Sequence, residues 1–248
     1  MSSRTKTEAF RRVRSIASRH ARRITKGLFR FCFWCGGVIV FAILAGNVHA
    51  NSEIAFDSAI LSALAERRTP SLNAAMKLLT EFGSARFLVL SSVIAVTILT
   101  LRRHWHSATY VAMVASGAGV LNALLKDLFA RDRPELPIVT AGGFAFPSGH
   151  SMGAAAVYGA IAIVVITRYP RLRWPMVAAC ALTVVVVGLT RAYLGVHYPS
   201  DIIAGWALGI TWALWLKPLI IGRGFAPKSI PRTELEADHF SKDELLSN

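Results

Sequence analysis

Six apolar stretches, each near the length of a bilayer-spanning helix, constrain this chain more than any other feature of its sequence. Charged residues or Pro/Gly breaks separate them, and they run over about 29–48, 84–101, 107–129, 150–167, 174–192 and 201–221. A helix needs roughly 20 predominantly apolar residues to cross the hydrocarbon core of a bilayer. The sequence therefore predicts an all-α membrane protein in which six transmembrane helices form a bundle.

The composition agrees with a membrane protein rather than a soluble domain. Of the 248 residues, 54% are hydrophobic and only 17% are charged, and the mean hydropathy is +0.46. The net charge of +14 suits either nucleic acid or anionic lipid as a partner. The position of the charges along the chain decides between these two classes.

The basic residues predict the orientation of the helices. Ten Lys and Arg residues lie in the first 30 positions, and further basic clusters occupy 102–103 and 168–173. Because Lys and Arg accumulate in cytoplasmic loops, both termini are expected in the cytoplasm of a multi-pass protein of the bacterial inner membrane. This charge suits anionic headgroups, and no nucleic-acid partner is expected.

The other loops then face the outer, periplasmic side. They cover 134–149 and 195–200, together with 51–83. The last of these is expected to be partly helical and interfacial, with one apolar side made of Phe56, Ile60, Leu61 and Leu64.

Three further features have plain structural interpretations. The residues before Asn51 weakly resemble a signal-peptidase site, but the charged region ahead of the first span is too long, which favours a retained anchor. Cys32 and Cys35 form a C-x-x-C inside that span and are interpreted as small apolar residues. Gly205 and Gly209 form a G-x-x-x-G, which predicts close helix packing.

Ionisable residues are costly inside a membrane, so those at the ends of the predicted spans are candidates for function. One such set on the predicted outer side lies where the third span ends. Lys126 is followed by Arg133 and Pro134. Alone, these cations are also explained as side chains that extend from a helix end to water.

A second polar set, Pro147–His150, begins the fourth span. Ser148 is expected to be the N-cap, and Gly149 allows a ligand to approach the backbone closely. The free N–H groups at this helix N-terminus form an anion site. The alternative is ordinary capping with a hydrated His150.

The third set contains Arg191, His197 and Asp201 at the start of the last span. Asp201 follows His197 by four residues, so its carboxylate can accept a proton from one ring nitrogen and fix the tautomer. The alternative is that Asp201 only stabilises the helix N-terminus and His197 is incidental.

Taken together, the three sets converge on one face and point to phosphate chemistry. Cations and N–H groups complement a phosphate, an Asp-oriented His is a nucleophile or base, and a second His can protonate a leaving oxygen. No Cys, His or carboxylate set has metal-ligand spacing, so neither a metal nor another cofactor is expected.

These residues resemble the three-part signature of the type-2 phosphatidic acid phosphatase superfamily, which includes bacterial acid phosphatases and vanadium haloperoxidases. The matching segments are Lys126-x6-Arg133-Pro134, Pro147–His150 and Thr190-Arg191-x5-His197-x3-Asp201. Thr190 replaces the usual Ser and keeps its hydroxyl. The resemblance covers about 85–220. The predicted membrane domain is longer, at 29–221, and it lies between a basic cytoplasmic segment (1–28) and a cytoplasmic tail (222–248).

The resemblance implies a metal-independent phosphatase acting on lipid phosphates or polyprenyl diphosphates at the outer membrane surface. His197 would form a phosphohistidine, Asp201 would orient it, and His150 would act as acid and then base. The phosphate would be held by Lys126, Arg133, Ser148, Gly149 and Arg191. No obligate protein partner is expected.

Three alternatives stay open at this point. A phosphotransferase would use the same intermediate with a lipid or sugar hydroxyl in place of water. A vanadate-dependent haloperoxidase would be expected to have the composition of a soluble enzyme. A non-catalytic lipid-binding scaffold would be favoured by the loss of a catalytic position.

Overall fold

The computed structural model describes residues 25, 31–32, 34–50, 54–135 and 137–220, and all regular elements in these ranges are helical. The all-α prediction is therefore confirmed for this part of the chain. The predicted tail and, apart from Thr25, the predicted basic segment lie outside the described residues.

The helices coincide within a few residues with the apolar stretches of the sequence, and 51–83 adds further ones. In chain order they are Trp34–His49, α2 (Ala55–Ala65), α3 (Pro70–Thr80), the 3-10 turn η1 (Glu81–Gly83), α4 (Ala85–Leu101), α5 (Trp105–Phe129), α6 (Gly149–Arg168), the 3-10 turn η2 (Pro170–Leu172), α7 (Arg173–Tyr193) and α8 (Pro199–Ile220).

Helices α5, α6, α7 with η2, and α8 are each long and apolar enough to cross a membrane. The segment from α3 to α4 makes a fifth candidate if it is counted as one span bent by 43°. Trp34–His49 is apolar but shorter than a span among the described residues. The structure thus supports four or five spans, and a total of six stays a prediction.

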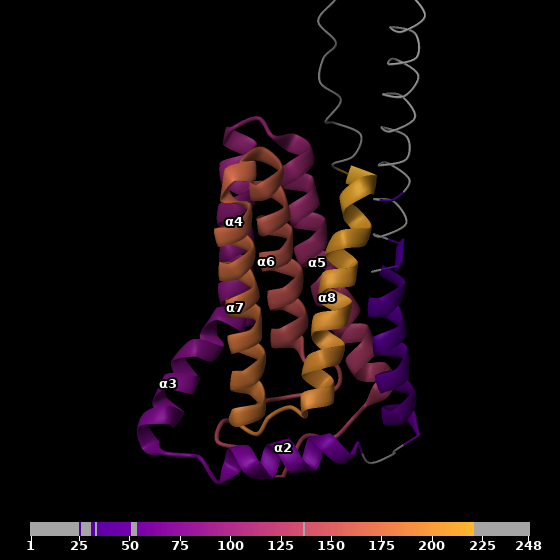
Figure 1. Cartoon of the computed structure of the whole chain (residues 1–248), viewed down its shortest axis with the longest axis vertical. Coiled ribbons are helices and arrows are strands. Elements are labelled where there is room, and N and C mark those ends of the chain that lie inside the picture. The colour runs from indigo at the N-terminus through magenta and orange to yellow at the C-terminus, as the bar shows by residue number, and fades with distance from the viewer. Residues whose placement is uncertain (1–24, 26–30, 33, 51–53, 136, 221–248) are drawn as a thin grey trace, which may run out of the picture.

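The bundle brings the ends of four helices together. Helices α4 to α8 lie side by side, and α5 and α7 end where α6 and α8 begin (Figure 1). Helix α2 crosses this end of the bundle, and α3 leads obliquely from it to α4 (Figure 1). The predicted helical character of 51–83 is confirmed, whereas its location at a membrane interface stays a prediction.

The predicted apolar side of α2 is divided between solvent and protein. Phe56 and Ile60 are exposed, whereas Leu64 packs against the buried cluster formed by Tyr193, Leu194 and Val196 after α7. Helix α2 is therefore anchored to the loop that carries His197.

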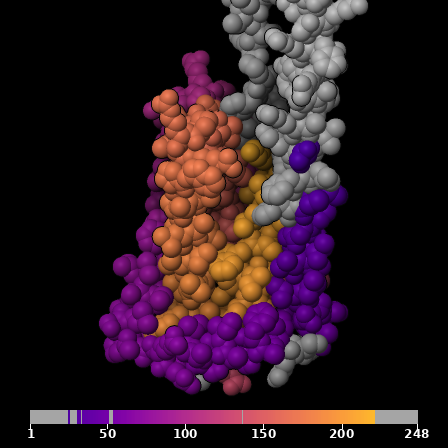
Figure 2. Space-filling view, in the orientation of Figure 1, coloured from indigo at the N-terminus to yellow at the C-terminus, as the bar shows by residue number. Residues whose placement is uncertain are grey.

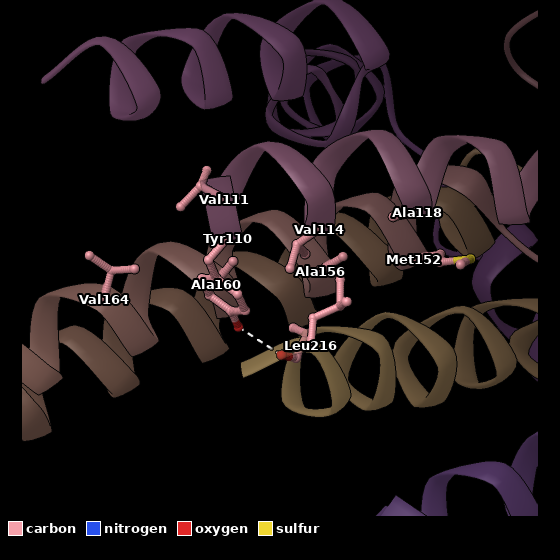
Figure 3. Packing of buried hydrophobic residues seen from close by; sticks show 10 residues of the cluster. Tyr110, Val111, Val114, Ala118, Met152, Ala156, Ala160, Val164 and Leu216 are labelled. Carbon is pink, nitrogen blue, oxygen red and sulfur yellow. Dashed lines mark hydrogen bonds between the residues drawn. The ribbon is translucent and has the colours of Figure 1, made fainter. Parts of the chain in front are cut away.

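The core is built mainly from α5, α6 and α8. Val111 and Val114 pack against Met152 and Ala156, and the Tyr110 hydroxyl donates to the carbonyl of Ala213 at 2.7 Å (Figure 3). This buried hydrogen bond satisfies a polar group that would otherwise be costly in the core.

The predicted close packing at Gly205 and Gly209 is confirmed. A Cβ atom at Gly205 would lie 2.8 Å from the carbonyl oxygen of Ser148, and one at Gly209 would lie 2.4 Å from that of Met152. Helices α6 and α8 thus contact each other through their backbones, which fixes the start of one against the start of the other.

The outer flank of the bundle is apolar. Only 11% of the most apolar stretch of η2 and α7 is buried within the protein. Figure 2 shows α7 at the surface of one flank, with α2 across the end. Apolar surface of this extent in a bundle is suited to contact with lipid.

Candidate active site

A cavity of about 590 Å³ lies at the end of the bundle where α5 and α7 end and α6 and α8 begin. Six of the eight site residues predicted from the sequence line it: Lys126, Arg133, Gly149, His150, Arg191 and His197. The walls also include Thr80, Glu81 and Ser84, which sequence analysis did not identify.

His197 and Asp201 form the expected pair. Nδ1 of His197 lies 3.5 Å from Oδ2 of Asp201, and both side chains are almost fully buried. The backbone N–H of Tyr198 donates to the same Oδ2 at 2.9 Å, which fixes the carboxylate beside the ring.

The environment of His197 favours the neutral imidazole. Burial lowers its pKa to about 4, although Asp201 acts in the opposite direction through a hydrogen bond and its charge. With the proton on Nδ1 facing Asp201, Nε2 carries the electron pair that a nucleophile requires, and Nη1 of Arg133 lies 3.2 Å from it.

Arg133 is held by the loops around the cavity. Nε donates to the carbonyl of Gly143, Nη2 to those of Gly142 and Phe144, and Nη1 to that of Val196. Nη1 also lies 3.2 Å from Nε2 of His197. All five N–H donors of the Arg133 guanidinium therefore have a partner, so this side chain can hold two phosphate oxygens only by giving up two of these contacts.

The other two cations retain donor capacity. Arg191 is nearly buried, and Nη1 donates to the hydroxyl of Thr80 at 2.8 Å. Its Nε is buried and has no hydrogen-bond partner among the described residues. Lys126 donates to the carbonyl of Phe144. An unpaired buried donor beside further cations is an arrangement that an anion would satisfy.

The start of α6 follows the sequence prediction except at one hydroxyl. Ser148 is the N-cap, and its Oγ accepts from both the N–H and the Oγ of Ser151. Ser148 is fully buried and does not line the cavity, and its predicted phosphate contact stays a prediction.

Gly149 does line the cavity, as expected. A Cβ atom there would lie 2.8 Å from Oδ1 of Asn122, whose amide donates to the carbonyl of Pro147. Only glycine leaves room for this contact. Asn122 had no motif to mark it in the sequence.

Sequence analysis also missed a charged cluster behind the cavity. Arg131 bridges Asp201 and Asp57, with Nη1 2.5 Å from Oδ1 of Asp201 and Nη2 2.9 Å from Oδ2 of Asp57. Ser200 lies between them and contacts both Arg131 and Asp57. Asp57 comes from α2, so this helix takes part in organising the site.

A second cavity, called the apolar groove, lies next to the first cavity, called the chamber, at the start of α6. It has a volume of about 660 Å³, lies between α4, α5 and α6, and includes Gly149 and His150 in its walls. Its other walls are mostly aliphatic or small and include Leu88, Val89, Val93, Val96, Gly119 and Val157. A polar, cationic chamber thus lies next to an apolar one, and Gly149 and His150 belong to the walls of both.

Metal-ligating side chains do not gather into a site within the described residues, where no group of three or more His, Cys, Asp or Glu is suitably placed. The charged side chains that line the cavity are Lys126, Arg133 and Arg191 together with Lys77 and Glu81, which sequence analysis did not identify.

Comparisons with known proteins show the family of this chain. A family model described as the PAP2 superfamily matches residues 107–224. Phosphatidylglycerophosphatase B of Bacillus subtilis is 35% identical over 177 residues, covering 69% of this chain and 87% of that protein. Lipid A 1-phosphatase of Rhizobium johnstonii is 31% identical, covering 59% of this chain and 67% of that protein.

A solved structure gives the same result for the fold. The crystal structure of a transmembrane PAP2-type phosphatidylglycerolphosphate phosphatase from Bacillus subtilis matches with a TM-score of 0.72 and 32% identity. The match covers 78% of this chain and 98% of that one.

Proposed function

Because this chain belongs to the PAP2 superfamily, we propose that it is an integral membrane phosphatase that hydrolyses lipid phosphates or diphosphates through a phosphohistidine intermediate. The observation that carries the proposal is the junction of the two cavities at His150. Four cations (Lys77, Lys126, Arg133 and Arg191) line the chamber, and mostly aliphatic or small residues line the groove. A phosphate with a hydrocarbon tail matches both.

The first step uses Nε2 of His197 as the nucleophile. Its electron pair forms a bond to phosphorus while the bond from phosphorus to the lipid oxygen breaks. The departing oxygen takes a proton from His150, which enters the step protonated. Asp201, 3.5 Å from Nδ1, stabilises the positive charge that develops on the ring of His197.

The second step reverses these roles. Neutral His150 takes a proton from water, whose oxygen attacks phosphorus, and the bond between phosphorus and Nε2 breaks. Inorganic phosphate leaves, and His150 is protonated for the next cycle. Arg133 and Arg191 stabilise the phosphoryl oxygens in both transition states, as does Lys126.

We place the chamber on the outer face of the membrane. The basic clusters at 102–103 and 168–173 belong to the opposite ends of the helices, and such clusters favour the cytoplasm. The substrate would then be a lipid of the outer leaflet of the inner membrane.

The test is phosphate release by the purified protein in detergent, with a chelator present. A suitable panel is phosphatidylglycerol phosphate, phosphatidate, undecaprenyl diphosphate and lipid A 1-phosphate. We expect release from at least one lipid and none from His197→Ala. Transfer of the phosphoryl group to an added alcohol in preference to water would identify a transferase, and inactivity toward all four lipids would contradict the proposal.

A further inference from the structure

We infer that Asp57 and Arg131 are positioning residues for the reaction, acting through Asp201 on the nucleophile His197. The inference rests on the proposed function. Asp57 lies in α2, outside the 107–224 segment that matches the family, so this part of the site is supplied from beyond the matched core.

The two carboxylate oxygens of Asp201 have different partners. Oδ1 accepts from Nη1 of Arg131 at 2.5 Å, whereas Oδ2 accepts from the N–H of Tyr198 and faces Nδ1 of His197. Arg131 thus occupies one oxygen and leaves the other directed at the imidazole. Without Arg131, nothing among these contacts holds Oδ1, and the carboxylate is free to rotate.

Arg131 is itself held in place by further contacts. Nη2 donates to Oδ2 of Asp57 at 2.9 Å, and the guanidinium stacks over the ring of Tyr198 at 4.1 Å. Nη1 also donates to Oγ of Ser200 at 2.7 Å. A planar guanidinium with several donors can bridge two carboxylates in this way, which a lysine cannot reproduce.

Asp57 attaches α2 to the start of α8. Oδ1 of Asp57 accepts from the backbone N–H of Ser200 at 2.8 Å, and the Ser200 hydroxyl donates to Oδ2. Asp57 therefore caps the helix that carries Asp201, from a position 143 residues away in the chain. This contact fixes Arg131, Ser200 and Asp201 as one unit.

The charges of this unit suit the proposed chemistry. Arg131 lies between two carboxylates, so the three groups together carry one excess negative charge. When Nε2 of His197 bonds to phosphorus, the imidazole ring becomes positive, and this negative unit lies against its Nδ1. Because Asp57 and Arg131 do not line the chamber, they act without touching the substrate.

The test is a double-mutant cycle in kcat. Loss of a hydrogen bond to a charged group predicts that Arg131→Met lowers kcat about tenfold to a hundredfold, with little change in KM. If Arg131 acts through Asp201, the same substitution in an Asp201→Asn background costs less than about threefold. Equal losses in both backgrounds, or wild-type kcat in Arg131→Met, would overturn the inference.

Controls separate positioning from a general loss of stability. Tyr110→Phe removes a buried hydrogen bond about 24 Å from Lys126 along α5, and should lower the melting temperature without lowering kcat. If Arg131→Met does not fold, Asp57→Asn enters the same cycle. A fall in kcat for Tyr110→Phe as large as that for a folded Arg131 or Asp57 variant would assign the effect to stability.

A second readout does not depend on turnover. Vanadate mimics five-coordinate phosphorus, so its affinity should fall in Arg131→Met and fall no further when Asp201→Asn is added. Turnover by the wild type together with unchanged vanadate affinity in Arg131→Met would overturn only the positioning roles. A wild type that neither releases phosphate from a lipid nor binds vanadate would overturn the proposed function as well.

Discussion

Filling the apolar groove should impair lipid substrates selectively. Gly119 lines the groove, and a Cβ atom built there meets nothing within 4 Å, so the first carbon of a leucine side chain fits at this position without a clash. Its four side-chain carbons would take the place of about three methylenes of a bound tail. At about 0.8 kcal/mol for each methylene, the loss is about 2.4 kcal/mol, or about fiftyfold in kcat/KM.

The assay compares a long-chain lipid phosphate with a small soluble ester such as p-nitrophenyl phosphate. The chamber is unchanged by the substitution, so hydrolysis of the soluble ester should stay at the wild-type level. Gly159→Leu is the matched control, because Gly159 also has nothing within 4 Å, lies in α6 and does not line the groove. Both variants gain the same helix propensity over glycine.

Two results would refute this reasoning. Equal losses for the lipid and the soluble ester would mean that Gly119→Leu disturbs the chamber. Unchanged lipid hydrolysis would mean that the tail does not occupy this groove.

Four further predictions concern the chamber and its orientation. The pKa of His197, followed by NMR of labelled rings, should be about 4 and should fall further in Asp201→Asn, because Asp201 favours the charged ring; a rise would contradict the assigned pairing. Arg191→Lys should lower kcat/KM by roughly tenfold or more, since lysine cannot hold two oxygens. Activity should also survive EDTA; loss of activity with rescue by Mg²⁺ would refute the metal-free mechanism. In a cysteine-free background, Glu135→Cys should react with an impermeant thiol reagent on intact cells and Arg102→Cys only after lysis, and the reverse would invert the orientation.

Much of the site could be predicted because its residues lie at the ends of apolar stretches. Alternate ends of successive helices meet on one side of a bundle, so Lys126, His150, Arg191 and His197 had to converge once the stretches were identified. Their types and spacing then indicated phosphate. The periodic apolar pattern likewise predicted the helices, since length and hydropathy decide which segments can span a bilayer.

The supporting residues could not be found in this way. Asp57 meets Ser200 only because α2 folds across the end of the bundle, and a single carboxylate in an amphipathic helix has no distinguishing pattern. Arg131 lay within the first motif but at a position that the motif leaves variable. Four of the contacts of Arg133 are to loop carbonyls, whose directions no sequence pattern specifies.

The backbone contact of Gly205 and Gly209 with α6 has a consequence for how the protein responds to its bilayer. Helices tilt further when the hydrocarbon layer becomes thinner than their apolar length. Helices α6 and α8 touch with no side chains between them near Ser148, so they are expected to tilt as one body. The distance between His150 and His197 would then stay the same in membranes of different thickness. The change in tilt would instead be taken up by α4 and the lipid-facing α7.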